Sequence, residues 1–274
     1  MNTLVVKVRV TMTSGGPETG TASNGDIQAV SRTAQILTLF GPETPEITVA
    51  EAAERLGLNR TTLHRYFASL EAAGVLERTE ERSSVFTPGR VLLQLGAFAI
   101  GRRKVIQLAT PHMRDLTRTT GLTVVLSLWG PSGPVVSHVE DDESHGTIVT
   151  VRVGSQLPLN AAQALVFLAF LPDQLTADRL LGTLPVDQRM HVRELIAGIR
   201  ERGMTGPILN ARGISVIAAP VYDKSAICAT LAFVGTAQLL PVGGSTRETA
   251  LLAEAAARVT AEMGGDATME GHHA

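Results

Sequence analysis

The chain has 274 residues, enough for one large domain or two ordinary ones, and its 44% hydrophobic and 18% charged residues exclude a wholly disordered protein. A formal charge of −2 excludes a polybasic nucleic-acid coat, so any DNA contact must come from locally placed basic residues. The single cysteine, Cys228, excludes an intrachain disulfide and a multi-cysteine zinc site, which favours a reducing cytoplasm.

Residues 1–26 are predicted to form a disordered tail, because residues 11–25 are rich in Gly, Ser and Thr. Lys7 and Arg9 interrupt any signal-peptide core, and the start of translation is open between Met1 and Met12. No stretch reaches the roughly 18 consecutive apolar residues that a membrane helix needs, so no membrane partner is expected.

Residues 27–57 are predicted to form the first two helices of a helix-turn-helix unit. Apolar residues recur at helical spacing along the first helix, namely Val30, Ala34, Leu37 and Phe40. In the second helix, Thr48 and Glu51 form a capping box, and Gly57 ends the helix after barely two turns. Short helices joined by a glycine-containing turn of about three residues are typical of helix-turn-helix proteins.

A third helix, residues 60–73, has the polar pattern of a recognition helix. Its inner face is predicted to contain Leu63, Tyr66, Phe67 and Leu70, with Gly74 ending the helix. Basic and hydroxyl side chains crowd its first two turns outside that face: Arg60, Thr61, Thr62, His64 and Arg65. Taken singly, each could be an ordinary solvated side chain. Together with the helix spacing, they favour contact with base edges and phosphates in the major groove.

Residues 75–78 and 84–87 are predicted to form the β-hairpin of a winged helix. Arg78 and Arg82 would then approach phosphate or the minor groove, and Arg32 on the first helix is a further candidate for DNA contact. Residues 27–90 hold seven arginines, eight glutamates and no lysine. The salt-dependent part of DNA affinity should therefore be modest, unless the acids lie on the far face.

These segments resemble the IclR family of bacterial transcriptional regulators. The resemblance rests on the motifs IQAVSRTAQILTLF, LNRTTLHRYFASLEAAGVLER, GSQLPLN, LAFLP and IAAPVYD, in that order. It extends from residue 27 to about residue 264. The T-x-H-R core at Thr62, His64 and Arg65 is fairly specific. Tyr66-Phe67 departs from the Leu-Leu that the family often has, and Ala-Leu-Val replaces its Gly-Lys in the helix beside the ligand pocket.

The resemblance implies a winged helix-turn-helix at residues 27–88, a linker helix at 89–104, an effector-binding domain at 105–264, and a tail at 265–274. The fold class is α+β, with a sensor domain related to GAF and PAS folds. The resemblance also implies a homodimer or homotetramer that binds a palindromic double-stranded DNA operator. A small-molecule effector would then control operator affinity, as in a ligand-gated repressor or activator.

The second half of the chain also predicts an α+β sensor domain by itself. A helix at residues 91–100 is apolar around much of its circumference. It should bury two faces, either on the DNA domain and a second subunit or in the core of one chain. Strands and helices then alternate in groups that favour an antiparallel sheet flanked by helices. Strands are expected at residues 123–129, 135–140, 147–153, 214–223 and 226–235. Helices are expected at residues 111–120, 161–171, 175–181, 189–203 and 251–264.

By family resemblance, the effector lies between the sheet and the loop at residues 154–161. The expected polar anchors are Asp223, Asn160 and Thr230, and the expected apolar wall is Trp129, Ala161 and Ala232. Gly154 belongs to the covering loop, and Cys228 faces either the pocket or the core. The alternative for Asp223 is that it opens a turn. A small organic acid or an aromatic acid is the expected effector.

The sequence contains no catalytic spacing that we recognise. It lacks G-x-S-x-G, H-E-x-x-H, a phosphate loop and G-x-G-x-x-G, so no catalytic residue, cofactor or enzyme activity is expected. The acidic, histidine-containing stretch at residues 138–145 is predicted to be a solvated loop and not a metal site. The alternative function is a small-molecule-binding or enzymatic α+β domain, whose helical N-terminus only mediates dimerisation.

Overall fold

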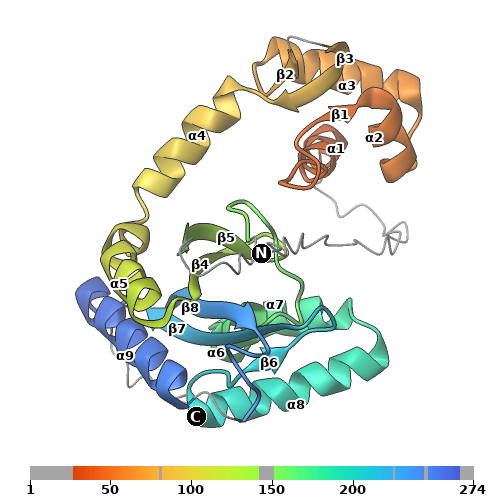
Figure 1. The fold of residues 1–274 in the computed structure, drawn as a ribbon. Coiled ribbons are helices and arrows are strands. Elements are labelled where there is room, and N and C mark those ends of the chain that lie inside the picture. Colours follow the sequence, from red (N-terminus) through yellow and green to blue (C-terminus); the bar gives the residue numbers. More distant parts are fainter. Residues whose placement is uncertain (1–26, 80–81, 142–150, 225, 244–245, 266–274) are drawn as a thin grey trace, which may run out of the picture. The chain divides into compact units, whose positions relative to one another are not determined.

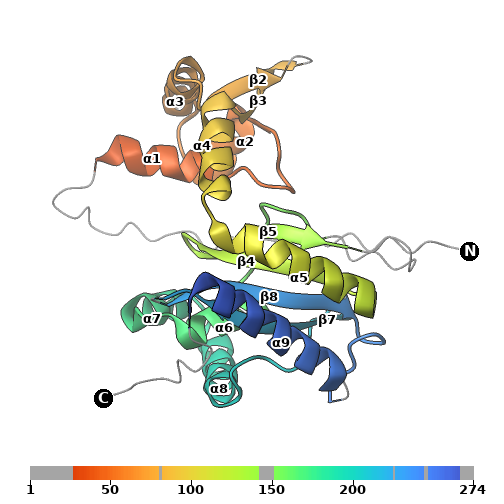
Figure 2. The same ribbon diagram turned by 90° about the vertical axis from the view of Figure 1, so that its left-hand side faces the viewer.

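A computed structural model describes residues 27–79, 82–141, 151–224, 226–243 and 246–265. It divides the described chain into two compact units, with the boundary between Arg102 and Arg103. Figures 1 and 2 show both units. Within the described residues, no helix is sufficiently long and apolar to cross a membrane.

The N-terminal unit is a winged helix-turn-helix, as predicted. Three helices and a small antiparallel sheet precede a fourth helix (Figure 1). The wing is the hairpin of β2 and β3, and the short strand β1, which the sequence did not predict, pairs with the other side of β3. The elements are α1 (Gln28–Leu37), β1 (Ile47–Thr48), α2 (Val49–Leu56), α3 (Arg60–Ala72), β2 (Leu76–Thr79), β3 (Arg82–Pro88) and α4 (Arg90–Gly101).

Local capping interactions fix the ends of α2 and α3. The Thr48 hydroxyl accepts from the Glu51 N–H at 3.2 Å, and the Glu51 carboxylate accepts from the Thr48 N–H at 2.8 Å. Asn59 caps α3 by accepting from the Thr61 N–H at 2.8 Å. Gly57 and Gly74 follow the two helices with φ of 63° and 71°, a left-handed conformation that glycine adopts without strain.

The core of this unit lies between α1, α2, α3 and the wing. Leu63 and Phe67 of α3 are almost fully buried, and the Phe67 ring packs edge-on against Phe86 of β3 with ring centroids 5.0 Å apart. On α1, however, the buried residue is Ile36, whereas Val30 is 64% exposed. The helical spacing of Val30 therefore does not bring it into the core of the single chain.

Helix α4 leaves its apolar surface open. No residue of α4 is buried, and Leu93 and Phe98 are 75% and 62% exposed. Within one chain, the expectation that this helix buries two faces is therefore not met. This helix exposes a large apolar area to water. Such an area is typical of a surface that is covered by another protein surface.

The C-terminal unit is an antiparallel sheet with helices on both faces, as predicted. Its strands have the order β5-β4-β8-β7-β6. Its helices are α5 (Lys104–Thr120), α6 (Ala162–Phe170), α7 (Gln174–Gly182), α8 (Val186–Arg202) and α9 (Thr246–Met263). Its strands are β4 (Thr123–Gly130), β5 (Gly133–Glu140), β6 (Ile208–Leu209), β7 (Ile214–Tyr222) and β8 (Ile227–Thr236).

Several predicted elements have other bounds in the structure, and one expected strand is not found among the described residues. Helix α5 begins at Lys104 and continues through Pro111, although proline is most often found at the start of a helix. Of the strand expected at residues 147–153, residues 147–150 lie outside the described residues, and residues 151–153 are not a strand.

Side chains alternate between two cores on the faces of the sheet. Helices α5 and α9 lie side by side on one face, over Val124, Leu231 and Phe233 (Figure 2). Helices α6, α7 and α8 cover part of the other face, over Ala218 and Ala232. Eight of the nine residues of α6 are buried, so this helix is the centre of the second core.

Candidate nucleic-acid interface and effector site

Helix α3 presents two chemically distinct faces. Leu63, Phe67 and Leu70 are buried in the core. The predicted DNA-contacting side chains are all exposed on the remaining surface of its first two turns: Arg60, Thr61, Thr62, His64 and Arg65. The structure therefore brings these five residues together on one open surface. Such a surface can offer cationic and hydrogen-bonding groups to DNA.

The exposed side of α3 also contains a shallow hollow of about 170 Å³. It is lined by Thr62, Arg65, Tyr66 and Ser69. The sequence placed Tyr66 on the inner face, but the structure leaves it half-buried at the edge of that face. Its ring packs against the core while the residue also lines the hollow, as an amphipathic side chain can.

The three other arginines that were predicted to contact DNA have different surroundings. Arg78 connects the wing to α3: its Nε donates to the Glu71 carboxylate at 2.8 Å, and its Nη1 donates to the Ser83 carbonyl. The Arg78 guanidinium also lies 4.6 Å from the centroid of the Phe86 ring. These contacts give Arg78 a structural role in the wing. Arg32 is half-buried on α1, and Arg82 begins β3, although its side chain lies outside the described residues.

Three of the predicted effector residues lie on the sheet face that α6 covers. Trp129, Thr230 and Ala232 share this face by strand alternation and register. The Trp129 ring lies 5.1 Å from the Phe167 ring of α6, measured between centroids. Thr230 and Ala232 are completely buried.

The predicted covering loop precedes α6. Gly154 and Asn160 are exposed, and the Gly154 N–H donates to the Val136 carbonyl at 2.8 Å, which ties the loop to edge strand β5. Gly154 has φ of 87°, a conformation that L side chains rarely adopt. Ala161 is the N-cap of α6, and it provides no side-chain cap. Backbone N–H groups at an uncapped helix start can donate hydrogen bonds to an anion.

Asp223 and Cys228 are not part of that group. The Asp223 carboxylate accepts from the Ala226 N–H at 3.0 Å, so it closes the turn between β7 and β8, as the alternative interpretation expected. Cys228 packs against the core on the α5 and α9 side. Burial, with a smaller contribution from the negative charge of Asp223, raises the pKa of the Cys228 thiol to about 12.

Sequence reasoning missed two buried polar residues, one on β4 and one on α6. Ser127 of β4 is completely buried, and Gln163 of α6 is 4% exposed. Ser127 pairs with Thr230 in the register of β4 and β8. A serine inside the apolar run TVVLSLW was the available signal, but its partner lies about a hundred residues away in the sequence.

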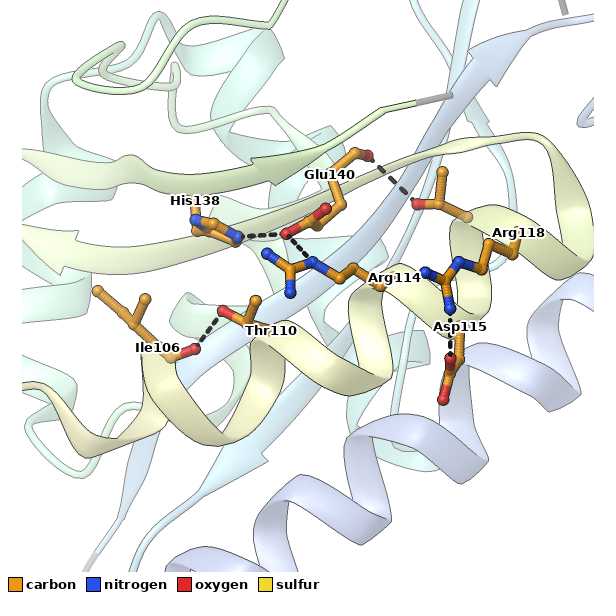
Figure 3. Close-up of polar contacts among 8 residues, drawn as sticks. Ile106, Thr110, Arg114, Asp115, Arg118, His138 and Glu140 are labelled. Carbon is orange, nitrogen blue, oxygen red and sulfur yellow. Dashed lines mark hydrogen bonds and ion pairs between the residues drawn. The ribbon is translucent and has the colours of Figure 1, made fainter. Parts of the chain in front are cut away.

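The acidic, histidine-containing stretch is described only at its beginning, residues 138–141. Glu140 accepts hydrogen bonds from His138 at 2.9 Å and Arg114 at 3.2 Å, and the Thr117 hydroxyl donates to the Glu140 carbonyl at 3.3 Å (Figure 3). These contacts fix the end of β5 to α5. The remaining residues, 142–145, lie outside the described residues. Among the described residues, no group of three His, Cys, Asp or Glu side chains could hold a metal ion.

Known proteins match both units. The model of the IclR helix-turn-helix domain matches residues 29–80, and the model of the bacterial transcriptional regulator IclR C-terminal domain matches residues 97–261. The HTH-type transcriptional regulator XynR of Escherichia coli K12 is 27% identical over 216 residues, which cover 75% of this chain and 84% of XynR. These are regulators and not enzymes.

Solved structures show the same fold. An IclR transcriptional regulator from Alicyclobacillus acidocaldarius has a TM-score of 0.69 and 25% identity, and the match covers 87% of this chain and 100% of that one. An IclR homologue from Microbacterium hydrocarbonoxydans, solved with 4-hydroxybenzoate, has a TM-score of 0.67 and 20% identity, with 86% and 98% covered. With one family model matching more than half of its length, the chain belongs to the IclR family of bacterial transcriptional regulators.

Proposed function

We propose that this regulator binds a specific operator through α3 and that a small molecule bound in the C-terminal unit changes its affinity for that operator. The main support for operator binding through α3 is the open surface of this helix. Its cationic and hydroxyl side chains project from a helix whose opposite face, Leu63, Phe67 and Leu70, is firmly buried. A helix held in this way can enter a major groove as a rigid element.

Within this proposal, Arg60, Thr61, Thr62, His64 and Arg65 contact base edges and nearby phosphates. Arg32 and Arg82 supply phosphate contacts outside the groove. Arg78 serves chiefly to hold the wing against α3, since Glu71 and Ser83 already occupy two of its nitrogens. The regulator acts in the cytoplasm, where its DNA is found.

The protein acts as a homodimer or a homotetramer on a palindromic operator. Support comes from the exposed apolar side chains of α4, of α1 and of the N-cap residue of α1. These are Leu93, Leu95, Phe98, Ile100, Val30 and Ile27, which are 48% to 75% exposed. A second copy is the natural occupant, because a twofold-symmetric dimer would place two α3 helices about 34 Å apart, in successive major grooves.

The effector is a small organic acid or an aromatic acid. The start of α6 has no side-chain cap, so its backbone N–H groups are suited to a carboxylate, and Trp129 and Ala232 provide an apolar surface. Gly154, Asn160 and Ala161 form the covering loop. The Microbacterium homologue was solved with such an acid, 4-hydroxybenzoate. Binding that differs between two arrangements of the protein would shift operator affinity.

Fluorescence anisotropy with labelled DNA from upstream of its own gene tests the operator proposal. Arg65→Ala should weaken binding about 5- to 150-fold, the range expected for losing one base contact. Arg118→Ala is the matched control, because Arg118 is an exposed arginine on α5. Equal affinity of the two variants would remove α3 from the interface. Binding by the wild-type chain that ignores salt, or no binding, would favour the alternative function without DNA.

A further inference from the structure

Two hydroxyl groups in the core of the C-terminal unit have no hydrogen-bond partner. Ser127 and Thr230 are each 0% exposed, and neither Ser127 Oγ nor Thr230 Oγ1 makes a hydrogen bond within the described structure. They are not independent, because Ser127 of β4 and Thr230 of β8 are direct register partners. Opposed residues of this kind have Cβ atoms roughly 4.5–5.5 Å apart.

Both side chains lie on the sheet face that α6 covers. Ser127 alternates with Val124 and Leu126 of the opposite core and lies in phase with Trp129, while Thr230 lies in phase with Ala232. Figure 1 shows α6 packed against this sheet beneath β7 and β8. The hydroxyl pair therefore lies on the same sheet face as Trp129, whose ring contacts Phe167 of α6.

Two buried hydroxyls without hydrogen-bond partners lower the stability of the folded protein. A buried hydroxyl without a partner loses its hydrogen bonds to water and gains none in return, and the cost here occurs twice at one place. An all-apolar pair such as alanine and valine would fill the same positions without that cost. The folded chain alone gives no reason to retain both groups, and a polar atom placed between them supplies one.

The residues around the hydroxyl pair indicate that the polar atom bound there is uncharged. Strands β4, β7 and β8 and helix α6 contain no charged residue. A carboxylate at the hydroxyl pair would therefore be buried without a cation from these four elements, which is strongly unfavourable. Each hydroxyl can donate one hydrogen bond and accept others, so a neutral hydroxyl or carbonyl oxygen suits both.

We propose that Ser127 and Thr230 bind an uncharged oxygen of the effector, at the end of the molecule opposite any carboxylate. This inference rests on the proposed effector domain and narrows its ligand class. The effector carries a neutral hydroxyl or carbonyl group on an apolar body, because Trp129 and Ala232 share this sheet face. The pair then discriminates against analogues that lack the oxygen and against those with a second charge.

The stability of the unliganded full chain provides the first test, with Ser127→Ala, Thr230→Val and the double variant. If the hydroxyls await a ligand, these apolar replacements should leave Tm unchanged or raise it. Ser215→Ala is the matched control, since Ser215 Oγ is also buried without a partner but lies in phase with Ile217 and Ala219 of the opposite core. A Tm lowered by more than ~4 °C in both single variants would overturn the proposal, because the hydroxyls would then already be satisfied, for example by a buried water.

Binding of matched small molecules provides the second test, with Trp129 fluorescence as the readout. We expect 4-hydroxybenzoate to bind the wild-type chain at least tenfold more tightly than benzoate, and terephthalate to fail. Phenol tests the hydroxyl without a carboxylate. The double variant should lose the preference for the hydroxyl, and Ser215→Ala should keep it. An unchanged preference in the double variant, or no binding of either 4-hydroxybenzoate or phenol, would overturn the proposal.

Operator binding without ligand separates this inference from the function on which it rests. The double variant should bind operator DNA as the wild-type chain does, because neither residue belongs to the N-terminal unit. Retained DNA binding with a failed ligand test overturns the hydroxyl site alone. Failure of the wild-type chain to bind DNA overturns the proposed function first.

Discussion

Removing the Phe67 side chain should destabilise the N-terminal unit selectively. Phe67 is 1% exposed and packs edge-on against Phe86. A buried Phe→Ala change costs about 3–5 kcal/mol. The unit formed by residues 27–102 has about 75 residues, for which a total stability of roughly 4–11 kcal/mol is typical. At the midpoints of these two ranges, Phe67→Ala should therefore remove about half of the stability of this unit and weaken operator binding.

The single tryptophan makes this selectivity measurable. Trp129, the only tryptophan of the chain, lies in the C-terminal unit. Its fluorescence reports unfolding of that unit, whereas far-ultraviolet circular dichroism reports helices of both. In a urea titration of Phe67→Ala, we expect an early loss of ellipticity while the fluorescence transition keeps the midpoint of the wild-type chain.

Phe233→Ala is the reciprocal control. Phe233 is 0% exposed in the core of the C-terminal unit, so its removal deletes the same group at an equally buried position. That variant should move the fluorescence transition and leave operator binding of the folded protein largely intact. If Phe67→Ala instead moved both signals by the same amount, the two units would unfold as one cooperative structure, and the reasoning from separate cores would be refuted.

Three further predictions concern single groups. Thr48→Ala should cost about 1 kcal/mol. Hydrogen bonds from Thr48 lower the pKa of Glu51 in the folded protein, so the stability that they provide is present above the ordinary pKa of 4.5 and is lost as pH falls through the lowered pKa. Thr48→Ala should therefore also make the free energy of unfolding depend less on pH, which urea titrations at neutral and acidic pH check. Gly74→Ala should cost about 1–2 kcal/mol in thermal melts, because φ is 71° and the new Cβ would lie 3.2 Å from Val91 Cγ2. With its pKa raised to about 12 by burial, Cys228 should react with a disulfide reagent near pH 8 far more slowly in the native protein than in urea.

The helix-turn-helix could be predicted because its determinants are local. Thr48 and Glu51 are three residues apart, and Asn59 caps the helix that starts at the next residue. Gly57 and Gly74 follow helices at positions with a left-handed backbone conformation, which glycine adopts without strain. In each case the interaction that fixes the structure lies within one turn of the residues that encode it.

The parts that escaped prediction depend on contacts between distant segments. Val30 fits the apolar spacing of α1, yet it is exposed, and Ile36 is the residue of α1 that is buried in the core. Spacing identifies an apolar stripe but not whether the same chain or another covers it. The Ser127–Thr230 pair requires the register of β4 and β8, which no local pattern encodes. Cys228 was left open between two faces for the same reason.

Net charge is a poor guide to the proposed DNA surface of this protein, and the position of each charge explains why. The exposed first two turns of α3 carry Arg60, His64 and Arg65 and no acidic residue. Glu71, further along the same helix, is neutralised by Arg78 at 2.8 Å. The sum of charges over the unit is nearly zero, but the acidic residues that balance Arg60 and Arg65 in this sum do not lie on the first two turns of α3. A duplex approaching the first turns of α3 meets cations, and the salt dependence of binding should reflect those few cations and not the sum.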